Sequence, residues 1–369
     1  MEPVVLDHGI SVLMRRWDHL IANSNGGRFT VQYEAEFAHL AIDVIVALGY
    51  GQSLDTLGTT HKQVARWVHD YNMLSMINLI LPIACTQWPF TLLIDSLLES
   101  KNEFVASVTT AIAARREQIK QMPRPTDILQ ALLDGEDPES KAKMTNTQIV
   151  SENIAIIVAS TDIVAQTLTW TLSYLMLYPQ TYYRATEEVR NGFSSYHKTI
   201  SYAQAKLKLH YTVACIYETM RIRAATGVFL PRIVPKGGAT FQGHFLPEGT
   251  ELGVNVAGAN HHKETWMNSR RFIPERFIDN DNLKPNIFTF SLGARVCPGK
   301  NLALMEILPT IANLLKNYDF TLPPSALFTP DKLDEHGNPI AMPRSHRFTS
   351  VGPTYPDRDC QIIVSKALK

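Results

Sequence analysis

The sequence predicts a mainly α-helical protein with a minor β region near its carboxyl end. Apolar residues recur at helical spacing through most of residues 10–222. Short β-prone segments separated by glycine-containing turns then follow between residues 232 and 256. Residues 145–178 contain no proline or glycine and are typical of one long helix. Because no linker of distinct composition divides the 369 residues, we predict a single domain over residues 1–369.

The periodicity assigns these elements in order. Predicted helices cover residues 10–21, 37–48, 61–81, 104–121, 127–133, 145–178, 182–193, 203–222 and 301–315. Predicted loops are the segment around Trp88, between Pro82 and Pro89, and the polar run 134–143. Predicted strands cover residues 232–234, 239–241, 244–246, 250–256 and 361–364.

Composition excludes several classes of protein. The chain has 35 basic and 35 acidic residues and a formal net charge of zero, so no nucleic-acid-binding footprint is expected. Its four scattered cysteines fit a reducing compartment better than a disulfide framework. The amino terminus has neither a basic segment nor an apolar core after it. We therefore expect no signal peptide and no membrane anchor in this chain.

The long predicted helix carries start signals and an apolar surface. Thr145 lies three residues before Gln148, which is the spacing of a capping box. Isoleucine, valine and leucine cover several of its faces, which predicts a helix buried all round. A transmembrane helix is an alternative by length alone, but Asp162, Gln166 and many Ser and Thr residues argue against it.

A cysteine lies between two glycines just before the last predicted helix. Gly293 and Gly299 allow the backbone around Cys297 to approach a bulky flat group closely. The amino end of the following helix favours a thiolate over a thiol, and a thiolate is a good ligand for heme iron. A single cysteine is more often a small buried apolar residue. A phosphate-binding loop does not fit, because Lys300 is followed by Asn301, and no partner cysteines stand at zinc-site spacing.

The wider pattern around this cysteine matches a known family. Phe290, Gly293, Arg295, Cys297 and Gly299 fill the pattern F-x-x-G-x-R-x-C-x-G. The segment resembles the heme-binding loop of the cytochrome P450 family. The resemblance implies the cytochrome P450 fold and a heme (iron protoporphyrin IX) whose iron takes Cys297 as axial ligand. It also implies that Phe290 packs on the thiolate side of the ring and that Gly299 belongs to the cofactor-binding loop.

Two further motifs support the resemblance. Glu218 and Arg221 stand three apart on one helix face, a spacing that is usually a solvated ion pair of little consequence. In the family such a pair forms a structural network with an arginine of a later loop. The segment 274–277, Pro-Glu-Arg-Phe, resembles that loop, so Arg276 is the implied third member.

The resemblance also implies partners for the heme propionates. Arg232, at the start of the first strand of the β region, and Arg295 resemble the arginines that hold these carboxylates. A buried dianionic ring requires nearby cations or hydrogen-bond donors. Solvated arginines at strand ends are the alternative.

The long helix departs from the family pattern. Asp162 stands at the position of the family's acid, which implies a catalytic role in proton delivery. Ile163 occupies the next position, where the family has a threonine that assists oxygen activation. Isoleucine neither donates nor accepts a hydrogen bond, so efficient O–O cleavage is in question.

The implied function is oxidation of an apolar small molecule by a heme-thiolate monooxygenase. The resemblance is to fungal members of microsomal type, with an NADPH-dependent reductase as electron donor and a role in secondary metabolism. Such members usually reside at the endoplasmic reticulum. Roughly the first quarter to third of a usual family chain has no counterpart here. Two alternatives remain: an isomerase or dehydratase that needs no dioxygen, suggested by Ile163, and a truncated non-catalytic remnant.

Overall fold

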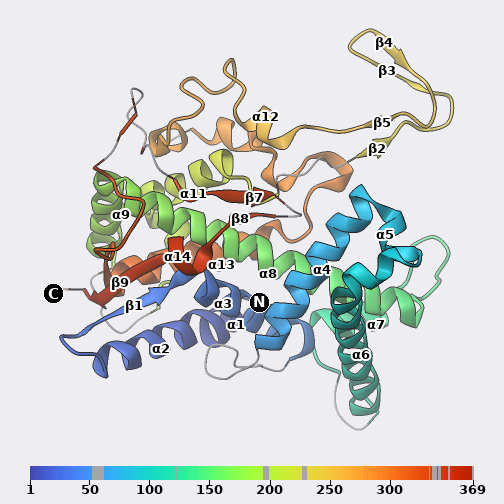
Figure 1. Cartoon of the computed structure of the whole chain (residues 1–369), viewed down its shortest axis with the longest axis horizontal. Helices are drawn as coiled ribbons and strands as arrows, with labels where there is room; N and C mark the ends of the chain where they lie inside the picture. The colour runs from blue at the N-terminus through green and yellow to red at the C-terminus, as the bar shows by residue number, and fades with distance from the viewer. Residues whose placement is uncertain are drawn as a thin grey trace.

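A computed structural model gives the fold. It describes residues 1–51, 62–120, 124–193, 199–226, 231–278, 280–331, 333–334, 339, 342–347 and 350–367. Helices make up most of the molecule, and its strands are short (Figure 1). This arrangement confirms the mainly α prediction.

The first 222 residues hold most of the helices. Short helical pieces are α1 (Glu2–Val4), η1 (Val5–Ile10), α5 (Pro82–Thr86), η2 (Phe90–Ile94), α7 (Ile128–Asp134) and α10 (Tyr202–Lys208). The longer helices are α2 (Ser11–Ala22), α3 (Tyr33–Tyr50), α4 (Lys62–Ile80), α6 (Asp95–Gln118), α8 (Asn146–Leu177), α9 (Pro179–Gly192) and α11 (His210–Ile222). One strand, β1 (Arg28–Gln32), lies among them.

The remainder alternates strands with short helices. Strands are β2 (Arg232–Ile233), β3 (Ala239–Phe241), β4 (His244–Leu246), β5 (Glu251–Leu252), β6 (Tyr318–Thr321), β7 (Ser345–Arg347), β8 (Val351–Pro353) and β9 (Gln361–Lys366). Helical segments are α12 (Val256–Asn260), η3 (Pro274–Phe277), η4 (Asp281–Asn286), η5 (Phe288–Phe290), η6 (Gly293–Arg295), α13 (Lys300–Asn317) and α14 (Pro356–Asp359).

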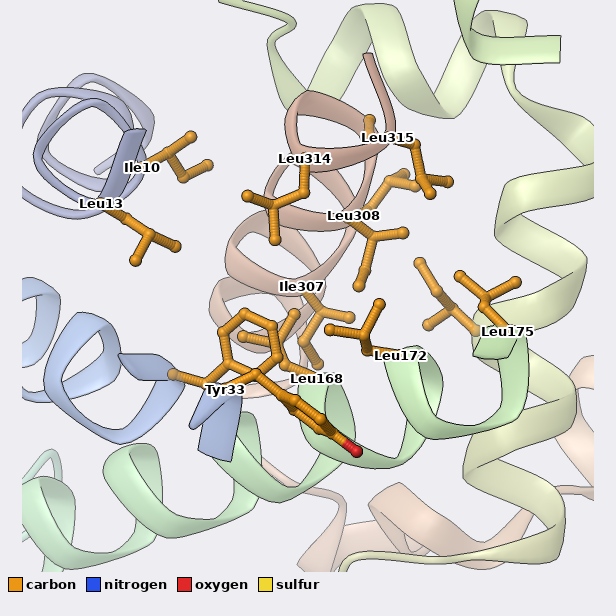
Figure 2. Packing of buried hydrophobic residues seen from close by; sticks show 14 of the residues in the cluster. Ile10, Leu13, Tyr33, Leu168, Leu172, Leu175, Ile307, Leu308, Leu314 and Leu315 are labelled. Carbon is orange, nitrogen blue, oxygen red and sulfur yellow. The ribbon is translucent and has the colours of Figure 1, made fainter. Parts of the chain in front are cut away.

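Helix α8 runs through the middle of the molecule (Figure 1). It begins at the predicted capping box, in which the Thr145 side chain accepts from the Gln148 amide and the Gln148 side chain accepts from the Thr145 amide. Its carboxyl half packs against α13, and Figure 2 shows Leu168 and Leu172 facing Ile307 and Leu308. The main core therefore lies where α8 crosses α13.

Two ends of the chain meet in one small sheet. Strand β9 pairs antiparallel with β1 on one side and with β6 on the other. Strands β1 and β9 lie side by side at one edge of the molecule (Figure 1). Three antiparallel strand pairs, β2–β5, β3–β4 and β7–β8, complete the β region among the described residues.

The structure corrects three predicted elements. The helix expected over 203–222 is two helices, because Leu209 leaves the helical conformation and Glu188 of α9 accepts the amides of Tyr211 and Thr212 at the start of α11 (2.7 and 2.9 Å). The strand expected over 250–256 is limited to β5, since Asn255 caps α12 by accepting the Gly258 amide. The segment around Trp88 holds α5 and η2 rather than only loop.

Helix α8 also differs from the expectation of burial all round. Every residue from Val164 to Leu177 is buried, but Ala155 and Ala159 in its amino half are exposed. Among the described residues α8 is the one helix that is long and apolar enough to cross a membrane, judged by length and composition alone. Its place at the centre of this fold accounts equally well for its apolar surface.

Candidate functional site

The Cys297 loop contains two short 3₁₀ turns, and the backbone where they join has positive φ angles. Segment η5 ends at Phe290, and Ser291 follows with φ +57°. Gly293 opens η6 with φ +69°, a left-handed conformation that glycine adopts without strain. The Cys297 amide then donates to the Phe290 carbonyl at 2.8 Å. This bond closes the loop and holds Cys297 in front of α13, which is capped by Gly299.

Two side-chain bonds fix this loop to the helices beneath it. The Thr289 hydroxyl donates to the Met220 carbonyl at the end of α11 (2.8 Å). The Phe288 amide donates to the Asn260 side-chain oxygen (3.1 Å), and Asn260 is fully buried at the end of α12. The amino-terminal side of the loop is thus anchored to α11 and α12 through residues that the sequence did not single out.

Glu218, Arg221 and Arg276 meet in one buried network. The Arg221 guanidinium donates to both Glu218 carboxylate oxygens (2.7 and 2.8 Å), and both side chains are 0% exposed. Arg276 Nε donates to Glu218 Oε1 at 3.1 Å. Arg221 also donates to the carbonyls of Asn260 and Ser269 (2.8 and 2.7 Å). Because Asn260 binds the cysteine loop as well, this network continues directly into the loop's anchor.

The remaining predicted residues lie around the loop in different environments. Phe290 is half-buried against the main core, with the Lys300 ammonium 5.6 Å from its ring centroid. Arg295 is exposed in η6. Arg232 is exposed at the start of β2, and its guanidinium donates to the Pro231 carbonyl (3.0 Å). Both arginines are therefore exposed, and their role in binding the heme propionates stays a prediction.

Comparison with known proteins decides the family. The model of the family described as "Cytochrome P450" matches residues 1–344. The chain belongs to the cytochrome P450 family. It is 35% identical to cytochrome P450 monooxygenase helB2 of Aspergillus fumigatus, over 99% of this chain and 73% of that protein. It is 34% identical to helB1 of the same organism, over 100% of this chain and 63% of that protein.

Solved structures agree on the fold. A crystal structure of the cytochrome P450 CYP102L1 superposes with a TM-score of 0.74 at 18% identity, over 97% of this chain and 72% of that one. The heme domain of cytochrome P450DA gives a TM-score of 0.76 at 15% identity, over 100% of this chain and 72% of that one. The chain thus has the cytochrome P450 fold and spans only part of the length of these relatives.

The family implies a heme iron, and the residues around Cys297 and on α8 fit such a group. The Cys297 thiol is half-buried, and the apolar side chains of Leu292 and Val296 beside it are 51% and 45% exposed. On α8, Ala155 and Ala159 form an exposed stripe of small residues one turn apart, next to half-buried Ile163. Uncovered apolar surface beside a soft sulfur ligand is what a large flat cofactor would cover.

Asp162 lies at one side of this stripe. Its carboxylate accepts a hydrogen bond from the Asn72 amide of α4 at 3.3 Å. Burial raises the pKa of Asp162, while hydrogen bonds from Ser350 and Gln166 and nearby His346 and His69 oppose the rise. The side chain can therefore hold a proton at higher pH than an ordinary aspartic acid. Sequence reasoning identified Asp162 but gave no signal for its partners on α4 and near β7 and β8, which are distant in sequence.

Proposed function

We propose that this cytochrome P450 is a heme-thiolate monooxygenase that oxidises an apolar small molecule. The observation that carries the proposal is the Cys297 loop, closed by the Cys297–Phe290 backbone bond and anchored through Thr289 and Asn260. In the proposal the Cys297 sulfur binds the iron, Phe290 and Gly299 shape the thiolate side, and Arg232 and Arg295 bind the propionates. Glu218, Arg221 and Arg276 maintain the scaffold.

The proposed reaction consumes electrons and protons. A thiolate-bound heme supplies reductive splitting of dioxygen, with one oxygen atom inserted into a C–H bond of the substrate and the other released as water. Two electrons and two protons balance this reaction. Asp162 is the proposed proton donor on α8, because burial raises its pKa and its neighbour Ile163 has no exchangeable proton.

An apolar substrate is supported by two uncovered apolar surfaces. The uncovered stripe of α8 presents alanine and isoleucine. A second uncovered apolar surface lies at the end of α4 and along α5 and η2, formed by Leu79, Ile80, Leu81, Ile83, Trp88, Phe90, Leu92 and Leu93. Small-molecule sites are lined mostly by apolar side chains, so an apolar molecule is the best match.

Electrons must come from outside the chain, and we assign them to an NADPH-dependent reductase. The fungal proteins helB1 and helB2 are named as cytochrome P450 monooxygenases, which supports this reaction class for the present chain. We also place the proposed substrate in fungal secondary metabolism. The chain spans 63% of helB1, so these assignments concern the part of the protein present here.

One specific observation favours a second function. Position 163 holds isoleucine, so the threonine hydroxyl that the family uses beside dioxygen is absent there. This replacement is compatible with a heme-thiolate isomerase or dehydratase, which needs neither oxygen nor a reductase.

An isotope experiment distinguishes the two functions. The heme-loaded chain is incubated with a reductase, NADPH, ¹⁸O₂ and a panel of apolar molecules. The monooxygenase proposal predicts one ¹⁸O atom per product molecule and, in coupled turnover, one NADPH consumed for each product molecule formed. Asp162→Asn should lower turnover by about 10²-fold, as loss of a general acid does, whereas Glu187→Gln on exposed α9 should not. A rearranged product formed without oxygen uptake would instead establish the isomerase.

A further inference from the structure

A cavity of about 340 Å³ lies between α3, α4, α8 and the β7–β8 hairpin. This volume is at the lower end of the range for small-molecule sites, about 300–1,000 Å³. It corresponds to about eleven water molecules at ~30 Å³ each. The cavity is therefore large enough for a small organic ligand.

Two carboxyl groups face this cavity from different helices. Glu34 of α3 accepts a hydrogen bond from the Gln166 amide nitrogen (3.1 Å), and Asp162 of α8 accepts one from Asn72 (3.3 Å). No lysine or arginine stands among the described residues that line the cavity. The described lining thus holds two potential negative charges, and histidines are its only potential cations.

Two residues of the lining carry an oxygen atom without a partner. Gln166 Oε1 and Thr161 Oγ1 make no hydrogen bond within the described structure, and their residues are only 5% and 3% exposed. Both residues line the cavity on α8, Thr161 directly before Asp162 and Gln166 one turn after it. A buried polar atom left unpaired is unfavourable, so a hydrogen-bonding group in the cavity that these side chains can turn towards would stabilise them.

The opposite wall is apolar and restricts the kind of donor. Ala38 and Ile42 of α3 and Val68 and Met73 of α4 line it. No group of three or more metal-ligating side chains is close enough to hold a metal ion in the described part of the chain. A ligand with a charged head and a short apolar body therefore fits better than an inorganic ion.

We propose that this cavity binds a small protonated amine. The ammonium group, with three N–H donors, bonds the carboxylates of Glu34 and Asp162 and the side-chain oxygen of Gln166, while its alkyl body lies against the α3–α4 wall. This site goes beyond the proposed oxidation and does not depend on bound heme. Because Asp162 belongs to both, an amine here would keep Asp162 ionised and couple the cavity to the proposed proton donor.

Titratable groups on every side determine how binding depends on pH. His39 and Glu34 on α3, His69 on α4, Asp162 on α8 and His346 on β7 line the cavity. Burial raises the pKa of Glu34 and of Asp162, and burial lowers the pKa of His346. Asp357 adds to the rise at Glu34. A carboxyl that is partly protonated must release its proton when an ammonium binds, so binding should liberate protons.

Calorimetric titration of the purified full chain with n-butylammonium chloride tests the proposal. We expect saturable binding whose heat depends on the ionisation enthalpy of the buffer, in the direction of proton release. n-Butanol has the same alkyl body without the charge, and potassium chloride has a cation without the body, so neither should give a saturable signal. Absence of saturation with n-butylammonium, or equal binding of n-butanol, would overturn the proposal.

Three variants locate the site. Glu34→Gln should weaken n-butylammonium binding by about tenfold or more, because it replaces a charge-assisted hydrogen bond with a neutral one. Ala38→Leu should weaken it by filling the apolar wall without altering a polar group. Glu187→Gln, an exposed acid on α9, should leave it unchanged. If both cavity variants are folded by circular dichroism and bind as the wild type does, the amine binds elsewhere and the proposal is wrong; if only one folds, that variant decides.

Discussion

The Glu218 carboxylate is the centre of the ion-pair network beside the cysteine loop. It accepts from Arg221, from Arg276 and from the Ile273 amide (2.9 Å), and it is fully buried. Removing its charge leaves two guanidinium groups without their carboxylate in an environment that water does not reach. Glu218→Gln should lower the free energy of unfolding by about 3–5 kcal/mol, measured from the midpoint of urea unfolding.

A matched exposed pair provides the control for Glu218. Glu117 near the end of α6 and Lys120 just after it have the same three-residue spacing (2.7 Å), but their side chains are 70% and 65% exposed. Glu117→Gln should therefore change the free energy of unfolding by less than about 1 kcal/mol. Equal effects of the two substitutions would show that burial of the Glu218 network contributes nothing to stability.

Glu306 on α13 is a buried acid without a partner. Neither carboxyl oxygen makes a hydrogen bond within the described residues, and burial raises its pKa well above the ordinary value of 4.5. An acid whose pKa is raised by folding stabilises the fold fully below the unfolded pKa, and this contribution is lost as the pH rises towards the folded pKa. Above the unfolded pKa, folding therefore requires the carboxyl either to bind a proton or to be buried with its charge.

Glu306→Gln should remove this pH dependence. Relative to the wild type, the variant should gain stability progressively as the pH rises above the ordinary glutamic acid pKa of 4.5. Urea unfolding of both proteins across this pH range measures the difference. A stability difference that is constant with pH would mean that the folded protein does not perturb this carboxyl.

At the scale of elements, α8 depends on its first turn. Its amino-terminal amides are satisfied by the Thr145–Gln148 capping box, and Ile149 just beyond it is buried. Thr145→Ala should cost about 1 kcal/mol of stability, because the side chain can no longer accept the Gln148 amide. Thr147→Ala, two residues inside the same helix and equally exposed, removes no cap and should cost much less. Urea midpoints compare the two, and equal losses would exclude a capping effect.

Elements with local signals could be predicted from the sequence, and elements defined by distant partners could not. The capping box and the apolar stripes gave α2, α3 and α8 correctly. Strand β1 was missed because its five residues pair with β9 at the far end of the chain. The break at Leu209 was missed because its cause, the Glu188 carboxylate on α9, is not a neighbour in sequence.

The same distinction applies to the site. The spacing of Glu218 and Arg221 indicated a shared helix face, and the pattern around Cys297 indicated the family. The bonds of Thr289 to Met220 and of Asn260 to Phe288 join segments that are 69 and 28 residues apart, so no local sequence pattern predicts them. The cavity between α3, α4 and α8 likewise exists only once three helices are packed together.

At the scale of the whole molecule, several elements of the fold hold the loop before α13 in place. Helix α13 packs against α8, α11 anchors the loop through Met220, and the Glu218 network reaches it through Asn260. These contacts present one half-buried sulfur beside uncovered apolar surface. We propose on this basis that Cys297 binds a heme iron as a thiolate.

The spectrum of the reduced carbon monoxide complex tests this claim most directly. The purified chain, loaded with heme, is reduced and exposed to carbon monoxide. We predict a thiolate-type Soret band in the wild type, its loss in Cys297→Ala and its retention in Cys85→Ala, which removes a partly exposed thiol elsewhere. A histidine-type band in the wild type, or a thiolate-type band that survives Cys297→Ala, would contradict it.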